Sequence, residues 1–225
     1  MLGQAIGNLL PSAVGVALSP IPIIAVILML ATPRAKSNGL AFAAGWIVGL
    51  VVVSVIVLFV ASDAGDPNGG TSDGVNWVKV AIGVLFLALA LKQWRGRPRH
   101  GEAAEMPKWM DTIDRFTAIK STGLGVVLSA LNPKNLALTL AAAASIAQAN
   151  LDTGDTTIAV AVFVVIASVS VLGPVLFYVL APQTAAKPLD AIKVFMSEHN
   201  AVIMFVLFLV LGAKILGDGL GGISA

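Results

Sequence analysis

The most constraining feature of the sequence is an apolar run, residues 123–147, with a lysine at its centre. The run is about 25 residues long, and a helix needs roughly 20 apolar residues to cross the hydrocarbon core of a bilayer. The tetrapeptide from Asn132 to Asn135 interrupts it, so Lys134 would lie about 16 Å from either end of a helical span. A lysine at that depth costs about 2.5–3.5 kcal/mol on insertion scales. The sequence therefore predicts a compensating interaction in the middle of the membrane.

Composition places the whole chain in the membrane class. Of its 225 residues, 57% are apolar and 12% are charged, with a mean hydropathy of +0.92, which is too apolar for a soluble domain. The net charge is +2, and the basic residues occupy short segments between apolar runs, so no nucleic-acid partner is expected. The absence of cysteine excludes disulfides, thiolate metal sites and thiol redox chemistry.

Six apolar runs predict an all-α membrane protein with six transmembrane helices. We expect two three-helix repeats, residues 1–91 and 123–225, joined by a basic cytoplasmic loop at 92–122. Prolines break the first span, and the polar tetrapeptide breaks the fourth. The six predicted spans are residues 2–31, 40–61, 75–91, 123–147, 156–181 and 201–216.

The distribution of basic residues predicts the topology. Short loops with excess lysine and arginine stay on the cytoplasmic side, and here they are the loops after the first, third and fifth spans. The loops on the opposite side are acidic. We therefore expect a multi-pass protein of the cytoplasmic membrane, with both termini on the outer side of the membrane. The basic loop residues are Arg34, Lys36, Lys92, Arg95, Arg97, Arg99, Lys108, Arg115, Lys120, Lys187 and Lys193.

Residues 106–120 carry an amphipathic pattern within the long basic loop. Met106, Met110, Ile113 and Phe116 recur at spacings of three and four residues, which predicts a helix with one apolar face. Such a helix either lies in the membrane interface or covers the inner face of the helical bundle. The pattern leaves both alternatives open.

A short internal repeat supports the division into halves. Residues 15–19 (GVALS) recur at 125–129 (GVVLS), and prolines follow both copies. The first span would run inward and the fourth outward, so the halves would be inverted. Inverted repeats with broken helices at matching positions point to a transport site near the midplane. We therefore expect an inverted 3+3 architecture.

The two breaks supply the candidate binding residues. Ser19–Pro20 and Asn132–Pro133 each pair a helix-capping residue with proline at the preferred first helical position. The half-helices that begin there would expose backbone N–H groups and partial positive charge, to which Lys134 adds a full charge. This predicts an electropositive midplane site for an anionic or strongly polar group, with no metal or cofactor. The predicted site residues are Ser19, Pro20, Pro22, Ser129, Asn132, Pro133, Lys134 and Asn135.

Structural roles compete with these functional ones. Prolines kink many membrane helices without any ligand. Because no acidic residue falls within a predicted span, Lys134 would otherwise pair with a backbone carbonyl. Ser168, Ser170 and Tyr178 could line the same cavity from the fifth span, but helix–helix hydrogen bonds are the preferred expectation for each. Small residues are expected to allow close helix packing, namely Gly45, Gly49, Gly83 and Gly212.

The two breaks resemble the paired signatures of the LysE superfamily of exporters, in residues 19–22 (SPIP) and 132–134 (NPK). Three further features resemble the GAP family, whose members include the glycopeptidolipid- and sulfolipid-addressing proteins of actinobacteria. These features are Gly45–Trp46, the segment Trp109–Asp114 and Gly173–Pro174. LysE-type exporters often have Pro-Gly-Pro in the first span, where this chain has Pro-Ile-Pro, which favours the GAP branch. The resemblance implies export or surface delivery of amphipathic lipids, alternating access driven by the proton gradient, and homodimers.

Two other functions stay open from the sequence. The chain could export a small solute such as an amino acid or organic anion, or it could assist a larger lipid-export machinery without transporting. Enzymes are not expected. An intramembrane redox enzyme would need cysteines, and neither His100 nor His199 has a visible serine–acid partnership.

Overall fold

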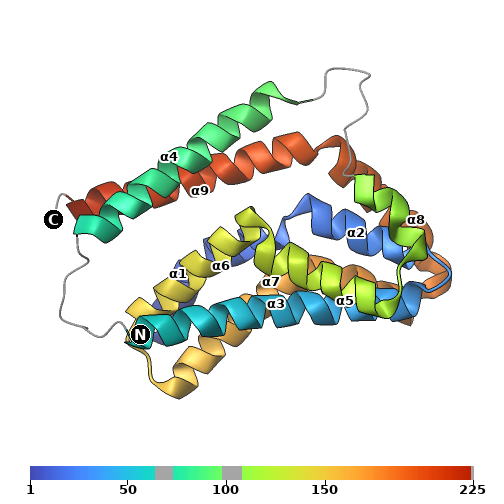
Figure 1. Ribbon diagram of the computed structural model, residues 1–225, viewed down its shortest axis with the longest axis horizontal. Coiled ribbons are helices and arrows are strands. Elements are labelled where there is room, and N and C mark those ends of the chain that lie inside the picture. The colour runs from blue at the N-terminus through green and yellow to red at the C-terminus, as the bar shows by residue number, and fades with distance from the viewer. Residues whose placement is uncertain (64–72, 98–107, 224–225) are drawn as a thin grey trace. The chain divides into compact units, whose positions relative to one another are not determined.

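The computed structural model describes residues 1–63, 73–97 and 108–223, and all regular structure in those residues is helical (Figure 1). The all-α fold class that the sequence predicts is therefore confirmed for this part of the chain. The elements are α1 (Leu2–Ala17), α2 (Pro20–Leu30), α3 (Ala35–Asp63), α4 (Asp73–Arg95), the 3₁₀ helix η1 (Lys108–Arg115), α5 (Ala118–Val126), the π-helical turn η2 (Val127–Leu131), α6 (Pro133–Gln148), α7 (Thr153–Leu180), α8 (Pro182–Glu198) and α9 (Asn200–Ile223).

The chain divides into two compact units. The larger unit contains α1 to α3 and the elements from η1 to α8, and it holds every residue of the predicted site. The smaller unit pairs α4 with α9 along their lengths. Phe86 and Phe208 pack edge to face within that pair, with ring centroids 5.4 Å apart.

Among the described residues, three helical segments are long and apolar enough to cross a membrane, namely Ala35–Val60, Thr153–Leu180 and Asn200–Gly221. Two bent helix pairs would each make one further span. The predicted third span, 75–91, lies within α4, which is not among these candidates. Charged residues occur along α4, including Lys92 and Arg95 in its last turn. Six spans therefore stay a prediction, whereas the membrane character of the chain is evident.

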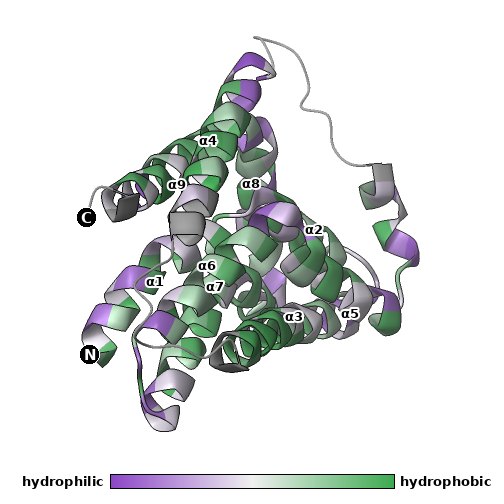
Figure 2. Ribbon diagram, turned by 60° about the vertical axis from the view of Figure 1, so that its left-hand side comes forward, coloured by the Kyte–Doolittle hydropathy of each residue, from purple (hydrophilic) through white to green (hydrophobic). Residues whose placement is uncertain are grey.

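Exposed apolar side chains also indicate a membrane protein. Figure 2 shows apolar residues along α2 and α3. On α3, Val52 and Ile56 are exposed, and on α7 Val165 and Val169 are exposed. Contiguous apolar surface of this kind is unfavourable in water and favourable against lipid tails. These helix faces therefore suit a bilayer.

Both predicted helix breaks are present. α1 and α2 are bent by 51° at Ser19, and the α5–η2 segment and α6 are bent by 62° at Asn132. Both residues have extended backbone angles, and a proline follows each as the first residue of the new helix. Proline causes the break because it lacks an N–H donor and clashes with the preceding turn. Asn132 caps α6 by accepting a hydrogen bond from the Lys134 backbone N–H at 3.1 Å.

The repeated pentapeptide does not align with the two breaks in the same way. Ser19 is the residue at the first break, but its counterpart Ser129 lies inside η2, three residues before the second break at Asn132. The π-helical turn η2 occupies this interval. The inverted 3+3 repeat therefore stays a prediction.

Glycines allow the predicted close helix packing. A Cβ atom on Gly45 of α3 would lie 2.1 Å from the Thr122 carbonyl oxygen, and one on Gly125 of α5 would lie 2.3 Å from the Phe42 carbonyl oxygen. The backbones of α3 and α5 are therefore in direct contact. In the smaller unit, a Cβ atom on Gly83 would lie 2.7 Å from the Leu216 backbone nitrogen.

Two segments of the larger unit differ from the prediction. A single amphipathic helix over 106–120 is wrong, because η1 ends at Arg115 and α5 starts at Ala118. Met110 and Ile113 are buried and η1 packs against α2, which favours the covering role over the interfacial one; Met106 lies outside the described residues. The second difference is α8, a helix in a segment that the sequence analysis treats as a loop.

Candidate functional site

The two helix breaks contact each other through Lys134. Its Nζ atom donates a hydrogen bond of 2.8 Å to the Gly15 carbonyl oxygen. Gly15 lies in the last turn of α1, where carbonyls lack partners within the helix. The Lys134 side chain is buried, with 8% of its surface exposed. In this structure Lys134 therefore pairs with a backbone carbonyl, which is the structural role that the sequence leaves open for it.

Helix electrostatics explain why this contact compensates the buried charge. Lys134 is the second residue of α6, where the partial positive charge of a helix N-terminus makes a cation unfavourable. Its side chain reaches the C-terminal end of α1, where partial negative charge favours a cation. The lysine thus carries its charge from the unfavourable end of one half-helix to the favourable end of another.

Asn135 forms a second connection between the breaks. The Ser19 hydroxyl donates a hydrogen bond of 2.7 Å to the Asn135 side-chain oxygen. The Asn135 amide nitrogen donates in turn to the Leu128 carbonyl oxygen at 2.9 Å. All of these groups are buried. The position of Ser19 suggested a cap, but its side chain makes no capping hydrogen bond to α2. It joins the start of α2 to the start of α6 instead.

The π-helical turn explains why the Leu128 carbonyl needs this amide. Asn132 N–H bonds to the Val127 carbonyl, five residues back, at 3.0 Å. The next backbone nitrogen belongs to Pro133, which has no hydrogen to donate. The Leu128 carbonyl would otherwise be unpaired at a buried position, which costs about 1–3 kcal/mol. Asn135 removes that cost from within the first turn of α6.

The structure joins only some of the predicted site residues. Ser19, Lys134 and Asn135 belong to the connected cluster, and Asn132 and Pro133 shape the start of α6. Ser129 is buried elsewhere on η2, where its hydroxyl donates to the Val126 carbonyl at 3.2 Å. Pro20 and Pro22 are buried in the first turn of α2.

Sequence reasoning missed the backbone acceptors of this cluster. The carbonyls of Gly15, Ala17 and Leu128 each accept a side-chain hydrogen bond. The donor to Ala17 is the hydroxyl of Ser170 on α7, so the predicted helix–helix hydrogen bond of Ser170 is confirmed. A similar bond for Ser168 is not present, because its buried hydroxyl has no hydrogen-bonding partner among the described residues.

The chemistry available at the cluster is that of recognition. It offers one ammonium group, one hydroxyl and two side-chain amides, surrounded by apolar helices. In the described part of the chain no group of three or more histidine, aspartate or glutamate residues is placed to hold a metal ion. The arrangement suits the binding of a polar or anionic group.

The fold and this cluster define a helical membrane protein in which two broken helices meet around a buried lysine. A family model described as "Sap, sulfolipid-1-addressing protein" matches residues 9–221, and the chain belongs to that family. The resemblance to the sulfolipid-addressing branch is thereby confirmed, while membership of the LysE superfamily stays a prediction. Searches of curated proteins and of solved structures found no match to the chain.

Proposed function

We propose that the chain is a secondary transporter that exports a polar or anionic amphipathic lipid, or a lipid precursor, across the cytoplasmic membrane. Its binding site would lie where the two helix breaks meet. The observation that carries the proposal is the pair of contacts across the breaks, Lys134 to Gly15 and Ser19 to Asn135. Secondary transporters often build their substrate sites from broken helices near the midplane of the membrane.

Lys134 supports the binding of an anionic headgroup by exchange of partners. In the described conformation its ammonium donates to the neutral Gly15 carbonyl. A sulfate or phosphate oxygen would be a stronger acceptor, because it carries a negative charge that adds Coulomb attraction to the hydrogen bond from the ammonium. A headgroup that replaced the carbonyl would release the end of α1 from the start of α6. Binding would thereby favour helix movement, as alternating access requires.

The family supports a lipid as the substrate. The family is named for sulfolipid-1, and a sulfolipid combines an anionic headgroup with apolar chains. The headgroup fits the ammonium, hydroxyl and amide groups of the cluster. The exposed apolar faces of α3 and α7 would keep the chains of such a lipid in a hydrocarbon environment. No catalytic step is part of this proposal.

The architecture that we propose is an inverted repeat of the LysE type, with both termini outside and a homodimer as the assembly. In its support, each half begins with a bent helix pair, α1 with α2 and α5–η2 with α6. Residues 1–91 would form one half and residues 123–225 the other. The substrate and any larger lipid-export machinery would be the partners.

Mass spectrometry of lipids that co-purify with the protein in mild detergent tests this function. We expect one anionic lipid class to be enriched with the unmodified protein and lost with Lys134→Met, which keeps the apolar stem and removes the charge. Lys187→Ala, which changes an exposed lysine on α8, is the matched control and should retain the lipid. Equal bulk phospholipid in all three samples would contradict lipid export and favour the small-solute exporter or the non-transporting accessory partner.

A further inference from the structure

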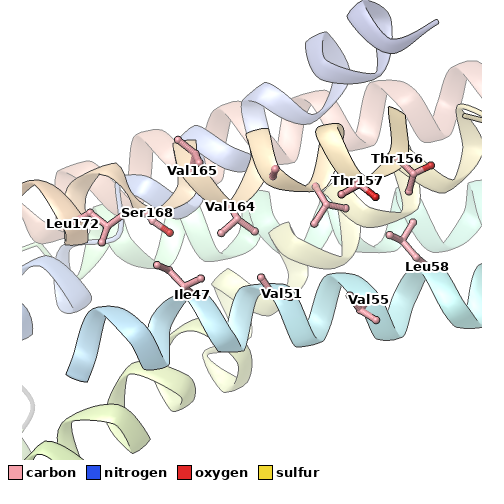
Figure 3. A pocket seen from close by; sticks show the side chains of 12 residues that line it. Ile47, Val51, Val55, Leu58, Thr156, Thr157, Val164, Val165, Ser168 and Leu172 are labelled. Atoms are coloured by element: carbon pink, nitrogen blue, oxygen red, sulfur yellow. The ribbon is translucent and has the colours of Figure 1, made fainter. Parts of the chain in front are cut away.

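An apolar groove lies between α3 and α7 in the larger unit (Figure 3). Its volume is about 520 Å³, within the range of small-molecule sites. On α3 it is lined by Ile47, Val51, Val55 and Leu58, which share one helix face at spacings of three and four residues. None of the described residues that line it is charged, so its interior suits a hydrocarbon chain and disfavours a charged headgroup.

The groove has the length of one membrane leaflet. From Ile47 to Leu58 the helix rises about 16 Å, and a hydrocarbon core about 30 Å thick contains two leaflets. The helices are antiparallel along it, with Thr156 and Thr157 at the end near Leu58, and Ser168 at the end near Ile47 (Figure 3). An extended hydrocarbon chain would fill it from the threonine end to Ser168.

Ser168 provides a polar group at the inner end of the groove. Its side chain is fully buried, and its oxygen has no hydrogen-bonding partner in the described part of the chain. Figure 3 shows this oxygen on the side of α7 that faces α3. Ser54 and Thr139, two other buried hydroxyl residues of the unit, bond to the carbonyl four residues earlier. An unpaired hydroxyl in hydrocarbon is costly, so an occupant that supplies an oxygen there is favoured over a plain chain.

The position of Ser168 relates the groove to the helix breaks. Ser170, two residues later on α7, donates its hydroxyl to the Ala17 carbonyl at the end of α1. Residues two apart on a helix point in nearly opposite directions. The groove therefore reaches the depth of the break cluster, on the other face of α7, and continues one helical turn further to Leu172.

We propose that the groove between α3 and α7 binds one hydrocarbon chain of a lipid, and that an ester or hydroxyl oxygen on that chain accepts a hydrogen bond from Ser168. The identification of this lipid with the exported substrate rests on the proposed function. The groove adds a chemical requirement to the proposed function: the preferred substrate lipid carries an oxygen atom on its hydrocarbon chain, far from the headgroup.

Photo-crosslinking in phosphatidylcholine vesicles tests the proposal. The probe is a phosphatidylglycerol with a diazirine on one chain at about 1% of the lipid, and the competitors are 12-hydroxystearoyl and stearoyl phosphatidylglycerol. We expect cross-links at the groove residues of α3 and α7, with the hydroxylated competitor about threefold to tenfold more effective, as one hydrogen bond predicts. Ser168→Ala should make the competitors equal. Ala161→Phe, which fills the groove, should reduce cross-linking, and Val169→Phe, on an exposed position outside the groove, should not.

Several results would overturn the proposal. Equal competition in the unmodified protein would remove the role of Ser168. Cross-links spread over all exposed faces of α3 and α7 would indicate ordinary surrounding lipid, and exclusion of the probe by a second copy of the chain would indicate a protein interface. The proposed function fails separately, if the lipid enrichment seen with the unmodified protein is not lost in Lys134→Met. Selective groove labelling without that dependence would retain the groove and reject the midplane site.

Discussion

Lys134, in the first turn of α6, donates a hydrogen bond of 2.8 Å to the carbonyl of Gly15, in the last turn of α1 and 119 positions earlier in the sequence. One side chain thus joins the end of a half-helix to the start of another. It satisfies a carbonyl that the first break leaves unpaired and places its positive charge at the partially negative C-terminal end of α1. The stability of the breaks and the proposed transport function therefore depend on the same residue.

Lys134→Ala and Asn132→Ala should each abolish transport of the anionic lipid while the protein still inserts into the membrane. The first variant removes the ammonium that would bind the headgroup, and the second removes the cap of α6. Lipid delivery to the outer leaflet of proteoliposomes, with protein yield in the membrane fraction as the control, measures both effects. Normal transport by both variants would reject the midplane site.

Asn135→Leu should lower the stability of the larger unit more than Lys134→Met lowers it. The leucine leaves the Leu128 carbonyl and the Ser19 hydroxyl without partners, and each such buried group costs about 1–3 kcal/mol. Thermal unfolding in detergent should show a clear decrease in the midpoint temperature. Asn8→Leu, which changes an exposed asparagine on α1, should leave the midpoint nearly unchanged. A midpoint for Asn135→Leu equal to that of Asn8→Leu would show that Asn135 does not hold the breaks together.

The sequence predicts the breaks well and their contact poorly, for a physical reason. Proline acts locally, because its missing N–H and its ring disfavour continuation of the preceding helix. Pro11, Pro174 and Pro188 nevertheless lie inside helices, whereas the capping residues Ser19 and Asn132 before Pro20 and Pro133 mark the two breaks in the sequence. The partner of Lys134 is a backbone carbonyl, and such acceptors are identical at every residue. Only the fold selects Gly15 among them.

Helix pattern explains the remaining differences. The spacing of Met110 and Ile113 predicts an apolar face, which the structure buries against α2, but spacing does not separate a short 3₁₀ helix from an α-helix. The segment of α8 is polar and contains Pro188 inside the helix, so a search for apolar spans passes over it. The π-helical turn η2 displaces Ser129 from the position that the repeat predicts for it.

Gly45→Ala should destabilise the protein, whereas Gly173→Ala should not. A Cβ atom at Gly45 would lie 2.1 Å from the Thr122 carbonyl oxygen, and a Cβ atom at Gly173 has no atom within 4 Å that it would meet. Overpacking of this kind costs about 1–3 kcal/mol, whereas alanine in an open helix position stabilises by roughly 0.5–1 kcal/mol relative to glycine. Thermal unfolding of the two variants under the same detergent conditions compares them directly. Similar midpoints would mean that α3 and α5 separate without cost.

Single cysteines should report the predicted topology, because the chain has no native cysteine that would give background labelling. Ser72 and Ser224, which the predicted topology places on the outer side, lie outside the described residues. Thr153 at the start of α7 and Lys187 on α8 are described and exposed. If α7 runs from outside to inside, a membrane-impermeant maleimide should label Thr153→Cys on intact cells and Lys187→Cys only after permeabilisation. The reverse pattern would invert the topology and, with it, the direction in which the α3–α7 groove opens.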